Sequence, residues 1–402
     1  MSDSSLPYSG PADPGAPGHV LPRPLWILTL GNFAIGTSAL MVAGVLGLVS
    51  SDLRVSLGHA GAVVTAYSLT YALSAVLLGS LTGRLARKPL MLAALGLFAL
   101  GNLGAALAPS FGVLIAARVL SAVGASLFTP VASGVAAALV APQLRGRALA
   151  LVFVGLAFST VVGVPLGTWI GTALGWRAAF WLVVGLSAVA LAGVALLVRP
   201  VRVAPPSAHW LHLLRRPVLA RSLLVMLLLY VGQFSVYPYL SALLHGATGL
   251  DPAGVVAMLL WFGAVGLLGN ALGGRLSDTW HGPRTLQLGL GLTALGLLAL
   301  PLLAASVWGM GLVLALWGLG SLLTNPPQQS QVVALSPDAP SVGLALNASA
   351  LYLGQALGAP LGGALAGAHP VWLGPVGGIM VLGALALAVY NGRVLRGAAA
   401  QG

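Results

Sequence analysis

Few residues of this 402-residue chain have side chains that could do chemistry. The chain has no cysteine and no glutamate, and its acidic residues are six aspartates: Asp3, Asp13, Asp52, Asp251, Asp278 and Asp338. The histidines show neither metal-ligand nor relay spacing, and Gly-x-Ser-x-Gly, His-Glu-x-x-His and phosphate-loop motifs are absent from the sequence. The sequence therefore predicts no metal site and no cofactor, and it argues against an enzyme.

Two charged residues stand out by their position. Arg118 is the only basic residue inside an apolar run, about two turns from one end of a helix predicted over 111–139. A guanidinium there needs a partner, which could be a carbonyl, a Ser or Asn side chain, water, or an anionic or carbonyl-bearing solute. Asp52 follows the first apolar run. Both residues are candidates for a group that responds to protons, and structural pairing is the alternative for each.

The composition indicates the solvent in which these residues act. The chain is 58% hydrophobic and 6% charged, with a mean hydropathy of +0.99, whereas soluble proteins are roughly 45–50% apolar and 25% charged. Stretches long enough to cross a bilayer recur about every 30 residues, and they predict twelve membrane-spanning helices. The net charge of +12 does not indicate nucleic-acid binding, because the basic residues lie between the apolar runs. Most of them fall on the side that holds both termini, which predicts that this side is cytoplasmic.

The stretch over 148–175 indicates how the chain is built. Small residues recur there at every fourth position and share one ridge of a helix: Gly155, Ser159, Gly163, Gly167, Gly171 and Gly175. Interior glycine and proline are costly in a soluble helix, whereas small-residue ridges let helices in lipid approach closely. The Gly-x-Pro-x-Gly run that contains Pro165 recurs 195 residues later, around Pro360. Because six spans separate the copies, the sequence predicts a parallel duplication.

The expected fold is an all-α membrane protein with two six-helix bundles. The bounds predicted for its parts are a disordered cytoplasmic tail over 1–24, a first bundle over 25–198, a cytoplasmic linker over 199–217, a second bundle over 218–392 and a cytoplasmic tail over 393–402.

Several motifs resemble those of the major facilitator superfamily. Gly79-Ser-Leu-Thr-Gly-Arg-Leu-Ala-Arg-Lys88 and Gly274-Arg-Leu-Ser-Asp278 resemble its loop signature, and Arg118 with Gly124 resembles its span-four arginine motif. Runs starting at Gly163, Gly232, Leu344 and Gly354 resemble the drug:proton antiporter branch that includes bacterial sugar, purine-nucleoside and chloramphenicol efflux transporters. The residues that carry gating and motif roles by this resemblance are Gly79, Gly83, Arg84, Arg87, Lys88, Gly163, Pro165, Gly167 and Asp278.

The resemblance implies an exporter that works by alternating access. It places the small-residue ridge at the contact between the two bundles. The residues expected to line the substrate pathway are polar or aromatic: Asn32, Thr37, Tyr67, Tyr71, Arg118, Phe158, Gln233, Phe234, Tyr237, Trp261, Gln328, Asn347, Tyr352 and Gln355. Such a lining, with no fixed counter-charge, suits neutral or weakly polar solutes such as drugs, sugars or nucleosides.

Two departures from the resembled pattern remove negative charge. Ala39 stands where that branch has a membrane glutamate, and Gly83 stands where the loop signature has an aspartate. Proton-coupled antiport is the function that the resemblance implies, with Arg118 and Asp52 as coupling candidates. An uncoupled facilitator, a coupling-impaired variant and a sensor that does not transport remain alternatives. The loss at Gly83 predicts a weaker inner gate and an inward-open state.

The partners expected for such a transporter are a small-molecule substrate, the lipid bilayer and, for an antiporter, protons. Nucleic acid is not among them. We expect a monomer that crosses the inner or plasma membrane many times.

Overall fold

The computed structural model describes residues 22–82, 85–201, 210–367 and 370–399, and these are helical with no strand among them. Eleven helices are long and apolar enough to cross a membrane, and a bent pair makes up to twelve spans. Helical spans are expected in lipid, because only helices and closed barrels satisfy the hydrogen bonds of the backbone N–H and C=O groups internally there. The predicted all-α fold with twelve spans is confirmed.

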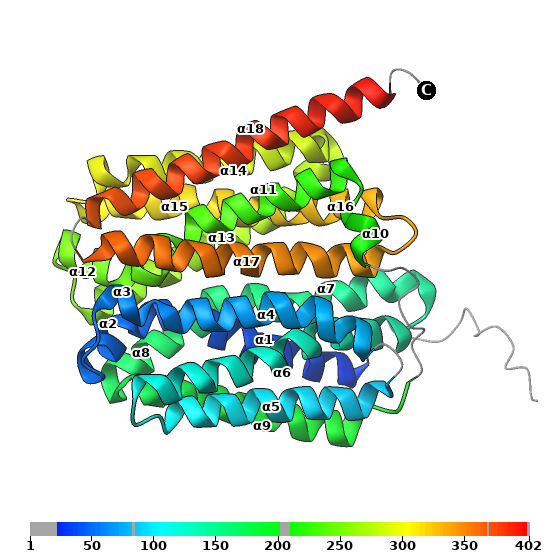
Figure 1. The fold of residues 1–402 in the computed structure, drawn as a ribbon, viewed down its shortest axis with the longest axis horizontal. Helices are drawn as coiled ribbons and strands as arrows, with labels where there is room; N and C mark the ends of the chain where they lie inside the picture. The colour runs from blue at the N-terminus through cyan, green and yellow to red at the C-terminus, as the bar shows by residue number, and fades with distance from the viewer. Residues whose placement is uncertain (1–21, 83–84, 202–209, 368–369, 400–402) are drawn as a thin grey trace, which may run out of the picture.

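The helices form two bundles, one drawn in blue to green and the other in green to red in Figure 1. The first bundle contains α1 (Arg23–Leu40), α2 (Val42–Asp52), α3 (Leu57–Ala60), α4 (Ala62–Leu81), α5 (Arg87–Ala106), α6 (Phe111–Ala138), η1 (Pro142–Leu144), α7 (Arg145–Phe158), η2 (Ser159–Gly163), α8 (Val164–Leu174) and α9 (Trp176–Leu197). The second contains α11 (Pro217–Phe234), η3 (Tyr237–Tyr239), α12 (Leu240–Thr248), α13 (Pro252–Trp280), α14 (Gly282–Leu303), α15 (Val307–Leu323), α16 (Asn325–Leu335), α17 (Pro340–Ala366), η4 (Pro370–Trp372) and α18 (Leu373–Ala399). Between the bundles, the short helix α10 (Trp210–Leu214) packs on α11 and α17.

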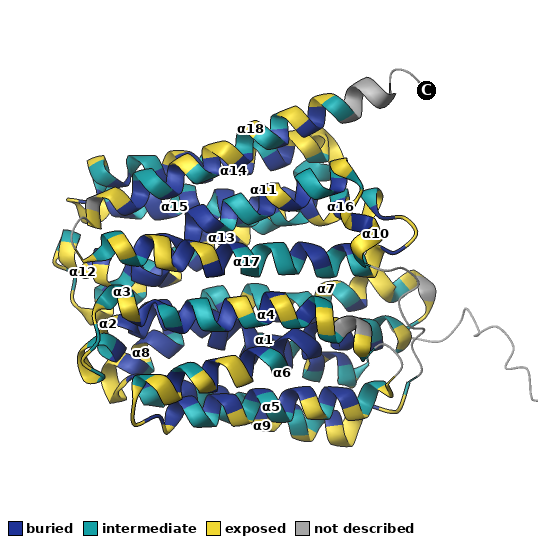
Figure 2. Ribbon diagram, viewed as in Figure 1, coloured by how far each residue is buried: buried dark blue, intermediate teal, exposed yellow. Residues whose placement is uncertain are grey.

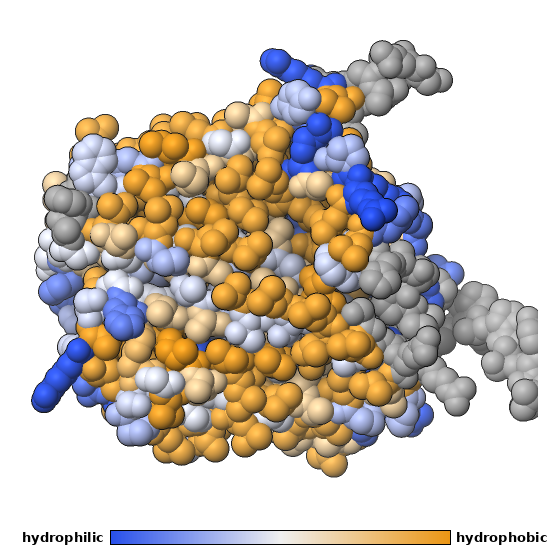
Figure 3. Space-filling view, viewed as in Figure 1, coloured by the Kyte–Doolittle hydropathy of each residue, from blue (hydrophilic) through white to orange (hydrophobic). Residues whose placement is uncertain are grey.

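Side chains on the outside of the molecule are apolar, and those between helices are buried. The face in Figure 3 is mostly hydrophobic between its two ends. Exposed positions run in stripes along the peripheral helices, as Figure 2 shows for α5 and α18. We call the end formed by α2, α3 and α12 the α12 end, and the opposite end the α10 end (Figure 1).

Several spans are broken, and two of the breaks follow the duplication. The first span bends by 47° between α1 and α2, at Met41. The seventh span breaks between α11 and η3, at residues 235–236, which are the 195-residue equivalents of residues 40–41. The fifth span contains a π-helical turn, η2, in which the N–H of Val164 bonds to the carbonyl of Ser159. Pro165 follows directly and has no N–H to donate, which accounts for a local change of helix type.

The small-residue ridge packs inside the first bundle, against α1. A Cβ added at Gly155 would meet the backbone carbonyl of Thr29 and lie 3.0 Å from the backbone nitrogen of Phe33. A Cβ added at Gly163 would meet the Thr37 side chain instead, 3.0 Å from the Thr37 Cβ atom. The expectation that this ridge forms the contact between bundles is therefore wrong, because four-residue spacing defines a helix face but not its partner.

The opposite side of the fifth span does reach the second bundle. A Cβ added at Gly263 of α13 would lie 2.7 Å from the Cα atom of Val161 in η2. The ridge is echoed in the second bundle by Gly354 and Gly358 of α17, which approach the backbone of α11 at Leu227 and Val231. Each copy therefore joins its helix to the first helix of its own bundle.

Contact between the bundles is stronger at the α12 end. The helices α4 and α17 lie side by side across the middle of the molecule (Figure 1). Near the α12 end, α2 also packs on α12 and η3, α3 packs on α17, and α8 packs on α13. Gly58 of α3 meets the carbonyl of Gly363 there. Among the described residues, α7, at the α10 end, makes no comparably extensive contact with the second bundle.

At the α10 end, an ion pair joins the segment after α10 to the second bundle. The Arg216 guanidinium donates to the Asp338 carboxylate at 2.8 Å and to the carbonyl of Leu335 at 3.2 Å. This hydrogen bond lowers the pKa of Asp338 below its usual value. Both side chains are partly exposed, so the pair contributes little to stability but fixes the position of this segment.

We predict that Gly155→Ala lowers the free energy of unfolding by about 1–3 kcal/mol, because the new methyl group meets backbone that cannot move aside. The matched control is Gly185→Ala in α9, where an added Cβ meets nothing within 4 Å. That control should be neutral or stabilising by up to about 1 kcal/mol, since alanine favours helix. Thermal unfolding of the purified protein in detergent measures both. Equal unfolding temperatures for the two variants would contradict the packing described here.

Candidate functional site

The first polar cluster, which we call the Arg118 cluster, lies inside the first bundle. Arg118 of α6 is fully buried, and its Nη1 donates to the Ser38 hydroxyl of α1 at 2.9 Å. The Ser38 hydroxyl in turn donates to Oδ1 of Asn102 in α5 at 2.7 Å. The Tyr67 ring of α4 covers the guanidinium, with 4.1 Å from the Arg118 Cζ to the ring centroid. Four helices therefore meet at one buried cation.

Part of this cluster has no hydrogen-bond partner. Within the described residues, Nε and Nη2 of Arg118 and the hydroxyl of Tyr67 are buried and unpartnered. The Thr37 hydroxyl, on the side of α1 that faces Gly163, is buried and unpartnered as well. The two ion pairs of the described residues lie elsewhere, at Asp52 and Asp338. A buried charge without a counter-charge is costly, so these donors favour a water molecule or an acceptor atom of a solute beside them.

A stack of tyrosines connects the Arg118 cluster to the second bundle. The rings of Tyr71 on α4 and Tyr352 on α17 are stacked, with 3.7 Å between their centroids. Tyr67 lies 6.4 Å from each of them. One turn away, the Ser68 hydroxyl donates to Oε1 of Gln355 at 2.9 Å. The contact between α4 and α17 is thus partly polar and aromatic, and it contains four of the predicted pathway residues.

The second polar cluster, which we call the Gln233 cluster, lies in the second bundle. Oε1 of Gln233 on α11 accepts hydrogen bonds from Trp317 Nε1 at 3.0 Å and from the Ser321 hydroxyl at 2.6 Å. Aromatic rings follow one another around it at centroid distances of 5.1 to 6.3 Å: Tyr230, Phe234, Tyr237, Phe262 and Trp317. A cavity of about 60 Å³ lies beside Gln233. Its wall includes Leu40 and Thr160 of the first bundle, so the cavity lies at the seam.

Two smaller sets of polar side chains are also buried between helices. Nε2 of Gln328 donates to Oδ1 of Asn347 at 3.0 Å and to the carbonyl of Ser222 at 2.9 Å, which joins α16, α17 and α11. In the first bundle, Asn32 donates to the carbonyl of Val152 at 3.0 Å and accepts from Thr129 at 2.9 Å. These amides link helices within a bundle.

Three candidate residues lie apart from the clusters. Trp261 is 48% exposed and donates to the carbonyl of Gly311 at 2.9 Å on the surface of α13 and α15. Phe158 is also about half exposed and pairs with Phe33 at 6.3 Å. Asp52 accepts from Arg177 at 2.6 Å and from Trp176 at 3.0 Å near the α12 end. The Asp52 carboxylate is therefore held by an exposed ion pair rather than by Arg118.

The loop-motif residues occupy the α10 end where they are described. Gly83 and Arg84 lie outside the described residues, and Gly79 belongs to α4. Arg87 begins α5, and Lys88 donates to the carbonyl of Ala195 at 2.7 Å, close to the end of α9. Asp278 is exposed near the end of α13. Gly163 of η2 and Gly167 of α8 belong to the small-residue ridge of the fifth span, which packs against Thr37 and Met41 of the first span. Pro165 lies between them.

Five residues of these clusters were not predicted from the sequence: Ser38, Asn102, Trp317, Ser321 and Phe262. Asn102 carries the signal of an amide in an apolar run, but it lies in a span that we did not expect to line the pathway. Trp317 offers no such signal, because an apolar run gives no indication that its indole N–H bonds to a buried amide.

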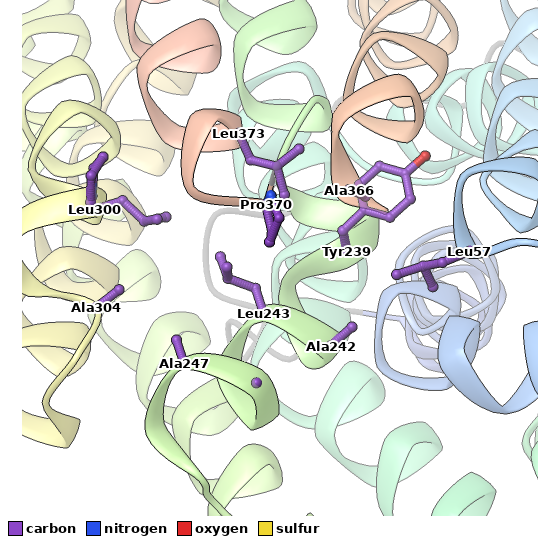
Figure 4. A pocket seen from close by; sticks show the side chains of 12 residues that line it. Leu57, Tyr239, Ala242, Leu243, Ala247, Leu300, Ala304, Ala366, Pro370 and Leu373 are labelled. Atoms are coloured by element: carbon purple, nitrogen blue, oxygen red, sulfur yellow. The ribbon is translucent and has the colours of Figure 1, made fainter. Parts of the chain in front are cut away.

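The largest cavity that we describe lies at the α12 end and is apolar. It measures about 310 Å³, and its wall is formed by α12, α14, η4, α18, the end of α17 and Leu57 of α3 (Figure 4). The Tyr239 hydroxyl donates to the carbonyl of Ala359 at 2.7 Å and is thus already bonded. This cavity contains neither polar cluster. Within the described residues, no group of three or more potential metal ligands occurs.

The two bundles with a seam of buried polar groups define a multi-pass membrane transporter. Residues 28–345 match the Major Facilitator Superfamily, and the chain belongs to this family. Its members are transporters of small molecules, not enzymes.

Individual proteins agree with this assignment. The inner membrane transport protein YdhP of Escherichia coli K12 is 33% identical over 374 residues, covering 91% of this chain and 95% of that protein. A chloramphenicol resistance protein of Streptomyces lividans is 31% identical over 376 residues, covering 92% and 95%. The crystal structure of the human organic anion transporter MFSD10 superposes with a TM-score of 0.71 at 19% identity, over 91% of this chain and all of that chain. At that identity the likeness shows the fold alone.

We predict opposite stability effects for two variants of the Arg118 cluster. Arg118→Met should keep or raise the unfolding temperature, because replacing a poorly paired buried charge by an apolar side chain removes its desolvation cost. Ser38→Ala should lower the free energy of unfolding by about 1–3 kcal/mol, because the guanidinium loses its side-chain acceptor. The matched control is Ser187→Ala in α9, whose hydroxyl bonds only within its helix, to the carbonyl of Val183. A larger loss of stability in Arg118→Met than in Ser38→Ala would show that the charge is better paired than described.

Proposed function

We propose that the protein exports small neutral or weakly polar solutes across the cytoplasmic membrane by alternating access. The observation that supports this most is the cavity beside Gln233, whose wall comes from both bundles and combines an amide with aromatic rings. Its lining residues include no Asp, Glu, His, Lys or Arg. Aromatic walls with few polar groups favour uncharged solutes. The relative named as a chloramphenicol resistance protein supports export of drug-like molecules of this kind.

The orientation in the membrane follows from the distribution of basic residues. The segments at the α10 end carry most of the arginines, and positively charged loops face the cytoplasm. We therefore assign the α10 end and both termini to the cytoplasm, and the α12 end to the outside. We propose that the protein works as a monomer, since each chain has its own seam between two bundles.

Closer contact at the α12 end supports an inward-open state. The two bundles meet there through α2, α3, α8, α12 and α13, whereas α7, in the described part of the chain, makes no comparably extensive contact with the second bundle at the α10 end. Gly83 stands where the loop signature has an aspartate. That carboxylate would stabilise the closed inner gate, so its absence fits an inward-open state.

Arg118 is the first candidate for a group that couples transport to protons. The Asp52 carboxylate forms an ion pair with Arg177 at the α12 end, whereas Arg118 is buried and has donors without a partner. Because no acid pairs with Arg118 in the described residues, a facilitator without proton coupling is the second candidate function.

We expect Ala39→Glu to increase proton movement that accompanies transport. The new carboxylate would stand next to Ser38 and supply the membrane acid that can be protonated and deprotonated. The measurement uses proteoliposomes loaded with labelled chloramphenicol and a pH-sensitive dye, with wild type and Ala39→Gln as the uncharged control. If wild type already moves protons with chloramphenicol and Ala39→Glu changes nothing, coupling runs through another group.

Distance measurements test the inward-open assignment. The chain has no cysteine, so spin labels can be placed freely. We expect a long distance between labels at Gly146→Cys and Arg275→Cys at the α10 end, and a short one between Ser51→Cys and His245→Cys at the α12 end. Adding Gly83→Asp should shorten the first distance and lengthen the second. Unchanged distances in the Gly83→Asp protein would sink the gating role of that position.

A further inference from the structure

We infer that the Gln233 carboxamide is a specificity-determining group that donates a hydrogen bond to an acceptor atom of the solute, and that this solute is a neutral aromatic molecule carrying a carbonyl or amide. This inference rests on the proposed export function and names its substrate class.

The orientation of the Gln233 amide is fixed by its neighbours. The Trp317 indole nitrogen can only donate a hydrogen bond, so the atom 3.0 Å away from it has to be the Gln233 oxygen. The Ser321 hydroxyl also donates to this oxygen, at 2.6 Å. With the oxygen held by two donors, the amide nitrogen points the other way, and an amide flip would leave the Trp317 N–H facing another donor.

The amide nitrogen is buried and unpartnered. Gln233 is 4% exposed, and its Nε2 has no hydrogen-bond partner among the described residues. An unmet donor of this kind costs free energy, and an acceptor beside it would recover that cost. Gln233 also lines the cavity of about 60 Å³, which is large enough for one functional group but not for a whole drug-sized molecule.

The surroundings of the cavity select the shape of that group. The Phe234 and Tyr237 ring centroids lie 5.4 Å apart, and Phe262 lies 5.9 Å from Tyr237. The Thr160 hydroxyl, on the first bundle, is already bonded to the carbonyl of Ala157 at 2.7 Å. Aromatic side chains stack favourably on flat groups. A planar group with an acceptor therefore fits the Gln233 nitrogen and the rings together.

The experiment separates donation by Gln233 from its role as an acceptor for Trp317 and Ser321. The probe is labelled chloramphenicol, a neutral aromatic amide, bound at equilibrium to the purified full-length protein. In Gln233→Glu the carbonyl oxygen can still accept from Trp317 and Ser321. The other oxygen carries a proton and donates in acidic buffer, but it is an acceptor once the carboxyl ionises.

We expect wild type to bind chloramphenicol equally at about pH 5 and about pH 8, because its amide does not titrate in this range. Gln233→Glu should bind like wild type at the acidic pH and at least about tenfold more weakly at the alkaline one. The matched control is Gln287→Glu in α14, which lies outside the cavity wall and should behave like wild type.

Other ionisable groups around α11 do not produce this difference. Those on the cavity wall and on the elements packed against α11 include tyrosines, arginines and histidines: Tyr230, Tyr237, Tyr239, Tyr352, Tyr390, Arg216, Arg221, Arg393, His212 and His245. These groups are the same in wild type, Gln233→Glu and Gln287→Glu, so the comparison among the three proteins removes their effect.

The other outcomes overturn the inference. The alkaline buffer is one in which infrared spectroscopy shows the introduced carboxyl to be ionised, because burial can raise its pKa. Equal binding of Gln233→Glu in the acidic and alkaline buffers would then mean that the amide is only an acceptor for Trp317 and Ser321, and loss in both would mean that donation is not what the solute needs. If Gln233→Glu does not fold, Trp317→Phe frees the amide to rotate and should weaken binding severalfold, and unchanged binding overturns the inference.

If wild type binds no chloramphenicol but transports glucose, the substrate class is wrong while export stands. Transport of neither solute contradicts the proposed function itself.

Discussion

Close approach of helix backbones within each bundle is the constraint on which the rest of the structure depends. Gly155 and Gly163 admit α1 in the first bundle, and Gly354 and Gly358 admit α11 in the second. Helices in lipid gain little from burying apolar surface against each other, so packing and hydrogen bonds between them have to supply the association. The helix that each ridge holds is the one that carries a central polar group, Ser38 on α1 and Gln233 on α11. Adding side chains to the ridge would displace both.

The duplication shows how one arrangement acquired two chemistries. Ser38 and Gln233 are separated by 195 residues, the same offset that relates the ridges and the breaks at the ends of α1 and α11. Each side chain accepts a hydrogen bond from the fourth span of its bundle, from Arg118 on α6 and from Trp317 on α15. The first bundle therefore presents unpartnered donors of a cation, and the second presents a neutral amide donor among aromatic rings. A buried cation and a neutral amide are thus separated between the two bundles.

The sequence predicted the fold well because lipid allows few structures. Apolar length gave the number of spans, and the repeated glycine and proline pattern gave the parallel duplication. The partner of the ridge was predicted wrongly, since a stripe of small residues fits any neighbouring backbone. Arg118, Gln233 and Tyr352 were named as polar or aromatic residues on spans that line the pathway in the resembled family. Arg118 and Gln233 lie in the two polar clusters, and Tyr352 lies in the tyrosine stack between the bundles. Trp261 was named on the same grounds and lies on the surface, because the direction of an aromatic side chain depends on packing that spacing does not encode.

The position of Tyr67 links the buried charge of Arg118 to the contact between the bundles. Its ring covers the Arg118 guanidinium, which has no acid to balance it in the described residues, and it is carried by α4. The same helix packs on α17 through the stacked rings of Tyr71 and Tyr352 and the bond from Ser68 to Gln355. Any rearrangement that separates α4 from α17 therefore disturbs the helix that shields the charge. Because a cation over an aromatic face is stabilised most when water is excluded, the alternating access that we propose would change the energy of Arg118 even without a carboxylate at position 39.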